Sequence, residues 1–277
     1  MNRTYPKKKS YSRLVNPLDY TRKTWMKTIL AINFFFLYFP IIALVAFSFN
    51  DSKRNIVWKG FTFKYYVKAY NNEALHSSFI NSIFVASIST LVSTLLGTML
   101  GLALYRYRFP GKAAYEGFAH LPIMIPEICM GIAMLAFFSL IEIPLSLFTI
   151  TVSHIAFTIP FVAVVIRARM SGFDTSLEEA SYDLGATQWQ TFWNVTFAYL
   201  RPGVVAGALL AFTLSIDDFV ITFFTAGIGS TTLPIKIYSM LRFSVTPEVN
   251  AASTVLIVLT LTLTIIAMTI QARASRR

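Results

Sequence analysis

Residues 178–193 read EEASYDLGATQWQTFW, a polar segment that lies between two long apolar runs, at about 144–166 and 202–226. Residues that favour a helix precede Gly185, and an aromatic-rich stretch follows it. A glycine at this point supplies the positive φ that a sharp reversal between two short helices requires. The stretch therefore predicts a helix, a glycine turn and a second helix, and a polar segment in so apolar a chain needs a partner. An amphipathic helix at the membrane surface is the alternative that these residues alone leave open.

The composition indicates an integral membrane protein. Of the 277 residues, 55% are hydrophobic and 13% are charged, whereas soluble domains are about a quarter charged. The aqueous segments are too short to hold a separate domain, so we expect one polytopic membrane domain. The net charge of +11 is explained by membrane orientation, and we expect no nucleic-acid partner. Cys129 is the single cysteine, which leaves this chain without an intrachain disulfide or a thiolate metal cluster, and no metal site is expected.

The hydrophobic runs and the basic residues together predict the topology. A membrane span takes about 20 apolar residues, and the six candidate runs are 28–49, 79–104, 118–140, 144–166, 202–226 and 250–271. If the N-terminus is inside, the cytoplasmic segments hold 17 of the 24 Lys and Arg residues and the outer loops hold 7. Because Lys and Arg concentrate on the cytoplasmic side, we expect both termini inside. Residues 1–27 then form a basic cytoplasmic tail, and residues 28–277 form the transmembrane domain.

Two carboxylates fall within the predicted fifth span. Asp217 and Asp218 are costly inside a membrane unless each faces a wet cavity, a partner or a cation. Neighbouring helix positions differ by about 100°, so both side chains cannot face one cavity. We therefore expect one to line a pathway and the other to bond to a neighbouring helix. Asp218 shares a helix face with Thr222 and Thr225. The alternative, that both carboxylates brace helix packing, stays open.

Other polar and small residues in the spans have local interpretations. Glu127 follows Pro126 in the third span, where a proline frees backbone carbonyls, so Glu127 is a further candidate contact for a cation. It could equally be solvated at a membrane end. His154 in the fourth span is expected to form an interhelical hydrogen bond rather than a proton relay. Two GxxxG patterns, 97–101 and 203–207, predict close helix packing.

Part of the polar segment carries a family resemblance. The chain resembles the permease subunits of binding-protein-dependent ABC importers, whose signature is Glu-Ala-Ala, three residues, Gly, nine residues, Ile, any residue and Leu-Pro. Four positions carry the resemblance: Glu179, Ala180, Gly185 and Val195, which stands conservatively for the Ile. Ser181 replaces the second Ala, and Phe197-Ala198 replaces Leu-Pro, so the signature does not define the end of the second short helix.

Further stretches narrow the resemblance to the spermidine/putrescine importer permeases, in particular to the second of the two permease subunits that pair there. They are ALYRYRF at 103–109, FTLSIDD at 212–218, LPIKIYSM at 233–240 and PEVNA at 247–251. The resemblance thus runs from the second span to the sixth and leaves out the basic N-terminal tail.

The resemblance implies a fold, partners and site residues. It implies an all-α membrane protein with six transmembrane helices, the type I ABC importer permease fold, and cytoplasmic coupling helices at about 174–193. Glu179, Ala180 and Gly185 would dock this segment on a cytoplasmic ABC ATPase dimer. A homologous second permease subunit, an extracytoplasmic polyamine-binding protein and the lipid of the bacterial inner membrane are the other implied partners. The substrate-pathway candidates are Asp217, Asp218 and Glu127.

The chain itself offers no site for energy conversion or catalysis. It has no GxxxxGK[ST] loop to bind phosphates, so ATP and Mg²⁺ would be bound by the partner ATPase and no cofactor is expected here. No catalytic residue is expected, because no HExxH or DxxD pattern surrounds the carboxylates of an imagined intramembrane enzyme. An ABC permease for another small solute and a stand-alone secondary transporter remain as alternatives. The sequence does not decide whether the permease pairs with a second copy of itself or with a homologue. It also does not decide whether the substrate is spermidine or putrescine.

Overall fold

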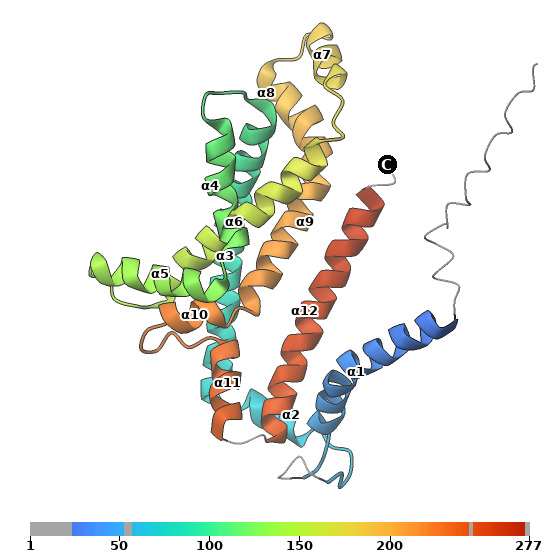
Figure 1. Cartoon of the computed structure of the whole chain (residues 1–277), viewed down its shortest axis with the longest axis vertical. Helices are drawn as coiled ribbons and strands as arrows, with labels where there is room; N and C mark the ends of the chain where they lie inside the picture. The colour runs from blue at the N-terminus through green and yellow to red at the C-terminus, as the bar shows by residue number, and fades with distance from the viewer. Residues whose placement is uncertain (1–23, 53–56, 244–245, 275–277) are drawn as a thin grey trace, which may run out of the picture. The chain divides into compact units, whose positions relative to one another are not determined.

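The computed structural model describes residues 24–52, 57–243 and 246–274. The predicted basic tail at 1–27 lies outside the described residues, except for the first turn of the first helix. The chain divides into two compact units, 1–47 and 48–277. The helices are α1 (Thr24–Ser48), α2 (Lys64–Tyr70), α3 (Glu73–Arg106), α4 (Lys112–Met124), α5 (Glu127–Leu140), α6 (Leu147–Met170), α7 (Ser176–Asp183), α8 (Gln188–Thr191), the π-helix η2 (Phe192–Thr196), α9 (Phe197–Ile216), α10 (Val220–Thr225), α11 (Leu233–Phe243) and α12 (Pro247–Ala274) (Figure 1).

The first unit holds almost all of α1, a helix of 25 residues that contains Pro40. Its side chains are mostly apolar and mostly exposed, including the stacked pair of Phe34 and Tyr38. A helix of this length and composition can cross a membrane, which fits the predicted first span.

The second unit supplies the remaining candidate spans. Among the described residues, five helices, α1 included, are long and apolar enough to cross a membrane, and the number is six if α4 and α5 form one broken span. The six predicted runs correspond to α1, α3, α4 with α5, α6, α9 with α10, and α12. The predicted all-α fold is confirmed.

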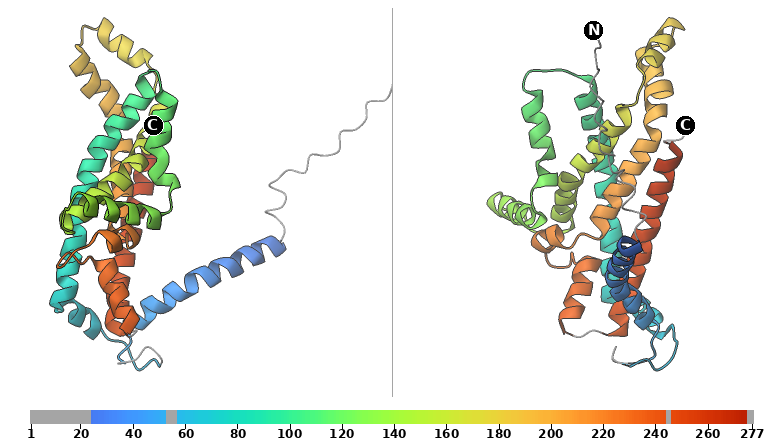
Figure 2. Two further views of the ribbon diagram at one scale, coloured as in Figure 1. Left: turned by 60° about the vertical axis from the view of Figure 1, so that its left-hand side comes forward. Right: turned by 45° about the vertical axis from the view of Figure 1, so that its right-hand side comes forward.

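The third predicted span differs from a straight helix. Its two halves, α4 and α5, meet at an angle of 105°, and α5 lies crosswise to α3 and α9 in both Figure 1 and Figure 2. Prolines explain the bend, because Pro122 lies inside α4 and Pro126 immediately precedes α5, and proline removes the amide donor that would continue a helix. The bend places Glu127 in the first turn of a new helix.

Small residues bring α3 and α9 against α6. An added side chain at Gly97 would approach Val162 Cβ to 2.6 Å, and one at Gly101 would approach Ile166 Cβ to 2.9 Å. On the other side, one at Gly207 would lie 3.2 Å from a Val162 methyl group. Both GxxxG patterns therefore pack on the same helix, as expected for close contacts between membrane helices. Helices α3, α6 and α9 thus form a three-helix core. The coupling segment and the intramembrane carboxylates, described below, are both connected to it.

A buried carboxylate joins α2 to the start of α12. Glu248 is 5% exposed, and its carboxylate accepts hydrogen bonds from Lys68 Nζ at 2.7 Å and from Asn72 Nδ2 at 2.8 Å. The hydrogen bond and the charge of Glu248 raise the pKa of Lys68. This contact fixes the short helix α2 against the start of the last span.

Candidate coupling segment and intramembrane carboxylates

The polar segment folds as the sequence predicts, into a helix, a glycine turn and a second helix. Gly185 has a φ of +84°, a region that residues with a Cβ rarely adopt. Its amide donates to the Tyr182 carbonyl at 2.8 Å, and the Ala186 amide donates to the Ser181 carbonyl at 3.0 Å. These two bonds satisfy carbonyls at the end of α7 and reverse the chain, as in a glycine-terminated helix.

Side chains set where each short helix begins. Asp174 Oδ1 accepts a hydrogen bond from the Ser176 amide at 3.0 Å, and this bond lowers the pKa of Asp174. Thr187 and Gln190 form a reciprocal capping box at the start of α8, with bonds of 3.3 and 2.8 Å. The second helix has no end of its own, because α8 passes through η2 into α9 without a break. The missing Leu-Pro of the family signature agrees with this continuity.

The outer surface of the segment is exposed and partly apolar. Glu179, Ala180 and Gly185 are all exposed, so the three predicted docking residues lie on one accessible segment. Leu184 is 89% exposed and Trp189 is 70% exposed. Large apolar side chains clustered on a polar surface are typical of protein interaction sites.

The inner surface of the segment makes contacts that the sequence did not predict. Glu178 in α7 pairs with Arg106 at the end of α3 and accepts a hydrogen bond from Thr196 Oγ1 at the end of η2. The Ser181 and Thr191 hydroxyls are 3.0 Å apart and join α7 to α8. In the sequence, Glu178 differs from Glu179 only by its place on the helix surface, and only the fold shows that its side chain points inward.

The two intramembrane aspartates lie at a break between helices. The sequence predicted a continuous fifth span, but α9 ends at Ile216 and α10 starts at Val220. Asp217 forms the C-cap of α9 and Asp218 follows it. The rotation of about 100° expected between neighbouring helix positions therefore does not apply to them. Instead, the break leaves Asp217 exposed and Asp218 buried.

Asp218 points into the protein. It is 8% exposed, and its Oδ2 accepts hydrogen bonds from the Thr222 amide at 2.8 Å and the Thr222 hydroxyl at 2.7 Å. Its Oδ1 accepts from the Ile221 amide at 3.3 Å. Asp218 thus caps the amide groups that the break leaves without helical carbonyl partners.

His154 of α6 extends this network to α9, α10 and α3. Its Nε2 lies 3.2 Å from Asp218 Oδ2 and 2.9 Å from Thr222 Oγ1. Its Nδ1 lies 2.7 Å from the Ser215 hydroxyl, which is 3.0 Å from the Ser89 hydroxyl of α3. Every member is buried, so each polar group needs the others. The predicted interhelical hydrogen bonding of His154 is confirmed.

Asp217 and Glu127 differ from the buried network in their exposure. Both side chains are exposed on the surface of this chain. The Asp217 carboxylate lies close enough to the Asp218 and Glu127 carboxylates for electrostatic repulsion, and α5 packs against α10 beside it. The fold therefore brings the three predicted pathway residues into one region and leaves two of them accessible. Within the described ranges, no three His, Cys, Asp or Glu side chains are arranged to hold a metal ion.

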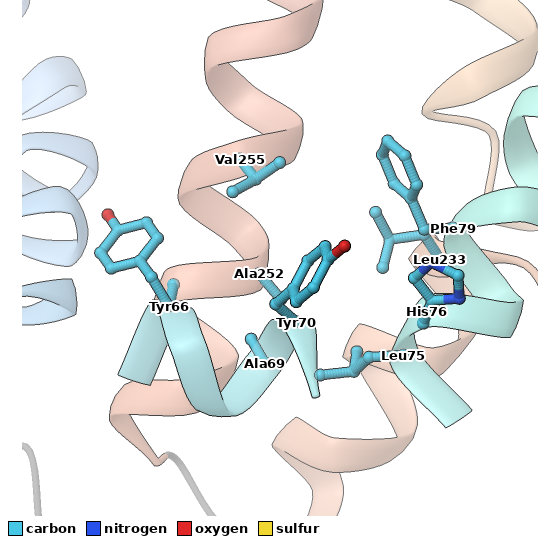
Figure 3. A pocket seen from close by; sticks show the side chains of 10 residues that line it. Tyr66, Ala69, Tyr70, Leu75, His76, Phe79, Leu233, Ala252 and Val255 are labelled. Atoms are coloured by element: carbon cyan, nitrogen blue, oxygen red, sulfur yellow. The ribbon is translucent and has the colours of Figure 1, made fainter. Parts of the chain in front are cut away.

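An apolar pocket of about 270 Å³ lies away from these carboxylates, near the starts of α3 and α12 (Figure 3). Figure 3 shows the side chains around it, among them Tyr66 and Tyr70 of α2 and Val255 of α12. His76 meets the edge of Tyr70 with ring centres 6.0 Å apart. The lining contains no carboxylate.

Sequence comparison places this architecture in a known family. Residues 93–277 match the family described as the binding-protein-dependent transport system inner membrane component. The chain belongs to this family. The matched region starts inside α3 and includes the coupling segment and all three carboxylates of the candidate pathway. The chain is therefore a permease, a transport subunit rather than an enzyme.

Individual relatives and a solved structure agree with the family. The permease is 41% identical over 230 residues to the spermidine/putrescine transport system permease protein PotC of Escherichia coli (strain K12), covering 83% of this chain and 87% of the relative. It is 35% identical over 250 residues to the putrescine transport system permease protein PotI of the same strain, covering 88% and 89%. A chain of a bacterial alginate ABC transporter, crystallised in complex with an alginate pentasaccharide-bound periplasmic protein, aligns with a TM-score of 0.68 at 17% identity, covering 95% and 98%. This likeness shows the fold, which is that of type I ABC importer permeases.

Proposed function

We propose that the permease forms half of the membrane pathway of an ATP-driven polyamine importer. A homologous second permease supplies the other half, an external binding protein delivers spermidine or putrescine, and a cytoplasmic ATPase dimer that binds ATP and Mg²⁺ drives transport. The observation that carries this proposal is the similarity over most of the chain to two permeases named for polyamine transport. PotC is the more similar of the two, which favours the second type of permease subunit in a spermidine/putrescine system.

The exposed carboxylates support a cationic substrate. A polyamine carries ammonium groups separated by short methylene chains, so its pathway needs carboxylates that can exchange one ammonium group for the next. Asp217 and Glu127 are exposed and repel one another, and a cation between them relieves that repulsion. Asp218 has its carboxylate occupied by Thr222 and His154. In our proposal Asp217 and Glu127 contact substrate, and Asp218 holds the helix break in place.

The exposed coupling segment supports the ATPase partner. Glu179, Ala180 and Gly185 match the family signature and lie on the accessible surface of the segment. Docking there would let ATPase closure move α9, because α8 is continuous with it.

We further propose that the permease lies in the bacterial cytoplasmic membrane, with both termini and the coupling segment in the cytoplasm. The support is the distribution of Lys and Arg, with 17 of 24 in the segments assigned inside. A Trp189→Cys variant in a Cys129→Ser background should resist a membrane-impermeant maleimide added outside intact cells. Rapid labelling from outside would reverse the assignment.

Uptake by the whole transporter tests the proposed function. Cells expressing the ATPase, both permeases and the binding protein are given radiolabelled putrescine or spermidine with unlabelled competitors, and matched cells lack only this chain. We expect ATP-dependent uptake only in the complete set, and competition ranks the two polyamines. Equal uptake without this chain would show that the permease transports another small solute.

A further inference from the structure

The contacts of Glu178 assign a role that the family signature does not include. One carboxylate joins three elements, because Glu178 lies in α7, Arg106 ends α3 and Thr196 ends η2. Thr196 is fully buried, and the Glu178 side chain is 13% exposed. Figure 1 shows α7 and α8 at the end of the molecule where α3 and α4 are connected.

The surrounding geometry makes Glu178 the main polar link between α7 and the membrane helices. In the part of the chain that the structure describes, the Ser181 side chain of α7 also hydrogen-bonds, to Thr191, and this contact reaches only the next short helix. The π-helical turn at 192–196 continues α8 into α9, but α7 lies outside this continuous helix because the Gly185 turn separates it from α8. A direct connection from α7 to α3 and α9 therefore needs side-chain contacts.

We propose that Glu178 is a positioning residue that transmits movement of the coupling helix to α3 and to the base of α9. This inference rests on the proposed function, because it assumes that an ATPase docks on α7. Through Arg106 the carboxylate makes α7 and the inner end of α3 move as one body, and through Thr196 it connects α7 to the residue at which η2 ends and α9 begins. Glu178 acts on substrate only through these helices.

The chain offers a matched control at the same end of the helices. Glu116 of α4 pairs with Arg167 of α6 at 3.3 Å and with Lys112 at 3.7 Å. This carboxylate also joins two helices by ion pairs, but it does not touch the coupling segment. The side chains of Arg106 and Arg167 are 39% and 40% exposed and stay partly solvated without their carboxylates, so removing either carboxylate should leave the complex assembled.

The first test measures polyamine imported per ATP hydrolysed in proteoliposomes containing the whole complex. Glu178→Ala should lower this ratio by about five-fold or more, the lower range of coupling between sites. Glu116→Ala should leave it within about two-fold of the wild type. Arg106→Glu with Glu178→Arg should recover most of the ratio that each single substitution loses. A wild-type ratio in Glu178→Ala, or no recovery in the charge swap, would overturn the proposal.

A second measurement needs no transported solute and so separates this inference from the proposed function. Spin labels at Asp183→Cys and Tyr107→Cys, in a Cys129→Ser background, report the separation of α7 from the end of α3. With Glu178 present, we expect one narrow distance distribution that is the same in the resting complex and after trapping with ATP and vanadate. Glu178→Ala should broaden it. A separation that changes on trapping in the wild-type background would show that α7 and α3 move independently.

Discussion

The helix break at residues 217–219 and the coupling segment at 174–196 are both polar regions of an apolar chain, but they satisfy their polar groups in opposite ways. At the break, Asp218, His154 and Ser215 are buried and bonded to one another. In the coupling segment most polar side chains face outward, and Glu178 is the carboxylate that turns inward. Burial therefore separates polar residues that hold this fold together from those that are free to meet a partner. Asp217 and Asp218 show the same division within two adjacent residues.

The largest expected effect is a loss of folding stability when the buried network at the helix break is disrupted. Asp218→Ala would leave His154, Thr222 and two backbone amides of α10 without their shared acceptor. Each buried donor that loses its acceptor costs about 1–3 kcal/mol, so several together make this the largest loss. We expect the assembled permease to unfold at a clearly lower temperature in detergent, measured by thermal unfolding after size-exclusion chromatography. A wild-type unfolding temperature for Asp218→Ala would remove the structural role assigned to this network.

Asp217→Asn tests the exposed side of the comparison. The substitution keeps the size of the side chain and removes its charge, so we expect normal assembly and a KM for polyamine uptake raised about ten-fold, equivalent to about 1.4 kcal/mol. Glu127→Gln should act in the same direction. An unchanged KM in both variants, at equal amounts of complex, would place the substrate elsewhere.

The glycine turn of the coupling segment gives a smaller effect. An added side chain at Gly185 would meet no atom within 4 Å, so the cost of substitution is conformational and not steric. A β-branched residue at this φ costs roughly 1–2 kcal/mol, whereas asparagine tolerates the left-handed region. We expect Gly185→Val to lower coupled uptake and Gly185→Asn to retain most of it. Equal losses in the two variants would indicate that the site needs the absence of a side chain.

The smallest effect is expected for one hydroxyl of the buried network. Thr222→Val keeps the shape of the side chain and removes the 2.7 Å bond to Asp218, which should cost about 1 kcal/mol of stability. The control is Thr262→Val, because Thr262 is exposed and bonds only to the carbonyl of Val258 in its own helix. Thermal unfolding in detergent should separate the two variants. Equal midpoints would mean that the network tolerates the loss of single members.

Much of the fold could be predicted from the sequence because it depends on local patterns. Apolar runs of sufficient length define the spans, Gly185 defines the turn, and the GxxxG patterns at 97–101 and 203–207 define close contacts. Each of these signals needs only a few neighbouring residues. They remain valid wherever the segments lie in the folded protein. The structure agrees with the turn and the close contacts, and with the spans apart from the bend between α4 and α5 and the break after Ile216.

The candidate sites were predicted less completely because they depend on contacts between distant segments. The pairs of Glu178 with Arg106 and of His154 with Ser215 join residues more than 60 positions apart, and no local pattern indicates them. The break after Ile216 also had no proline or glycine signal. It is stabilised by the carboxylate of Asp218, whose partner His154 lies on another helix. The prediction that one aspartate bonds internally agrees with the structure, but the sequence could not decide which.

Chemical labelling at positions 217 and 218 tests most directly whether Asp217 faces the pathway while Asp218 is buried in the protein. Asp217→Cys and Asp218→Cys are made separately in a Cys129→Ser background, and the assembled transporter is treated with a small cationic thiol reagent, with and without spermidine. We predict that Asp217→Cys reacts quickly and that spermidine slows the reaction, while Asp218→Cys reacts slowly under both conditions. Fast, spermidine-protected labelling at position 218 with none at 217 would contradict the account.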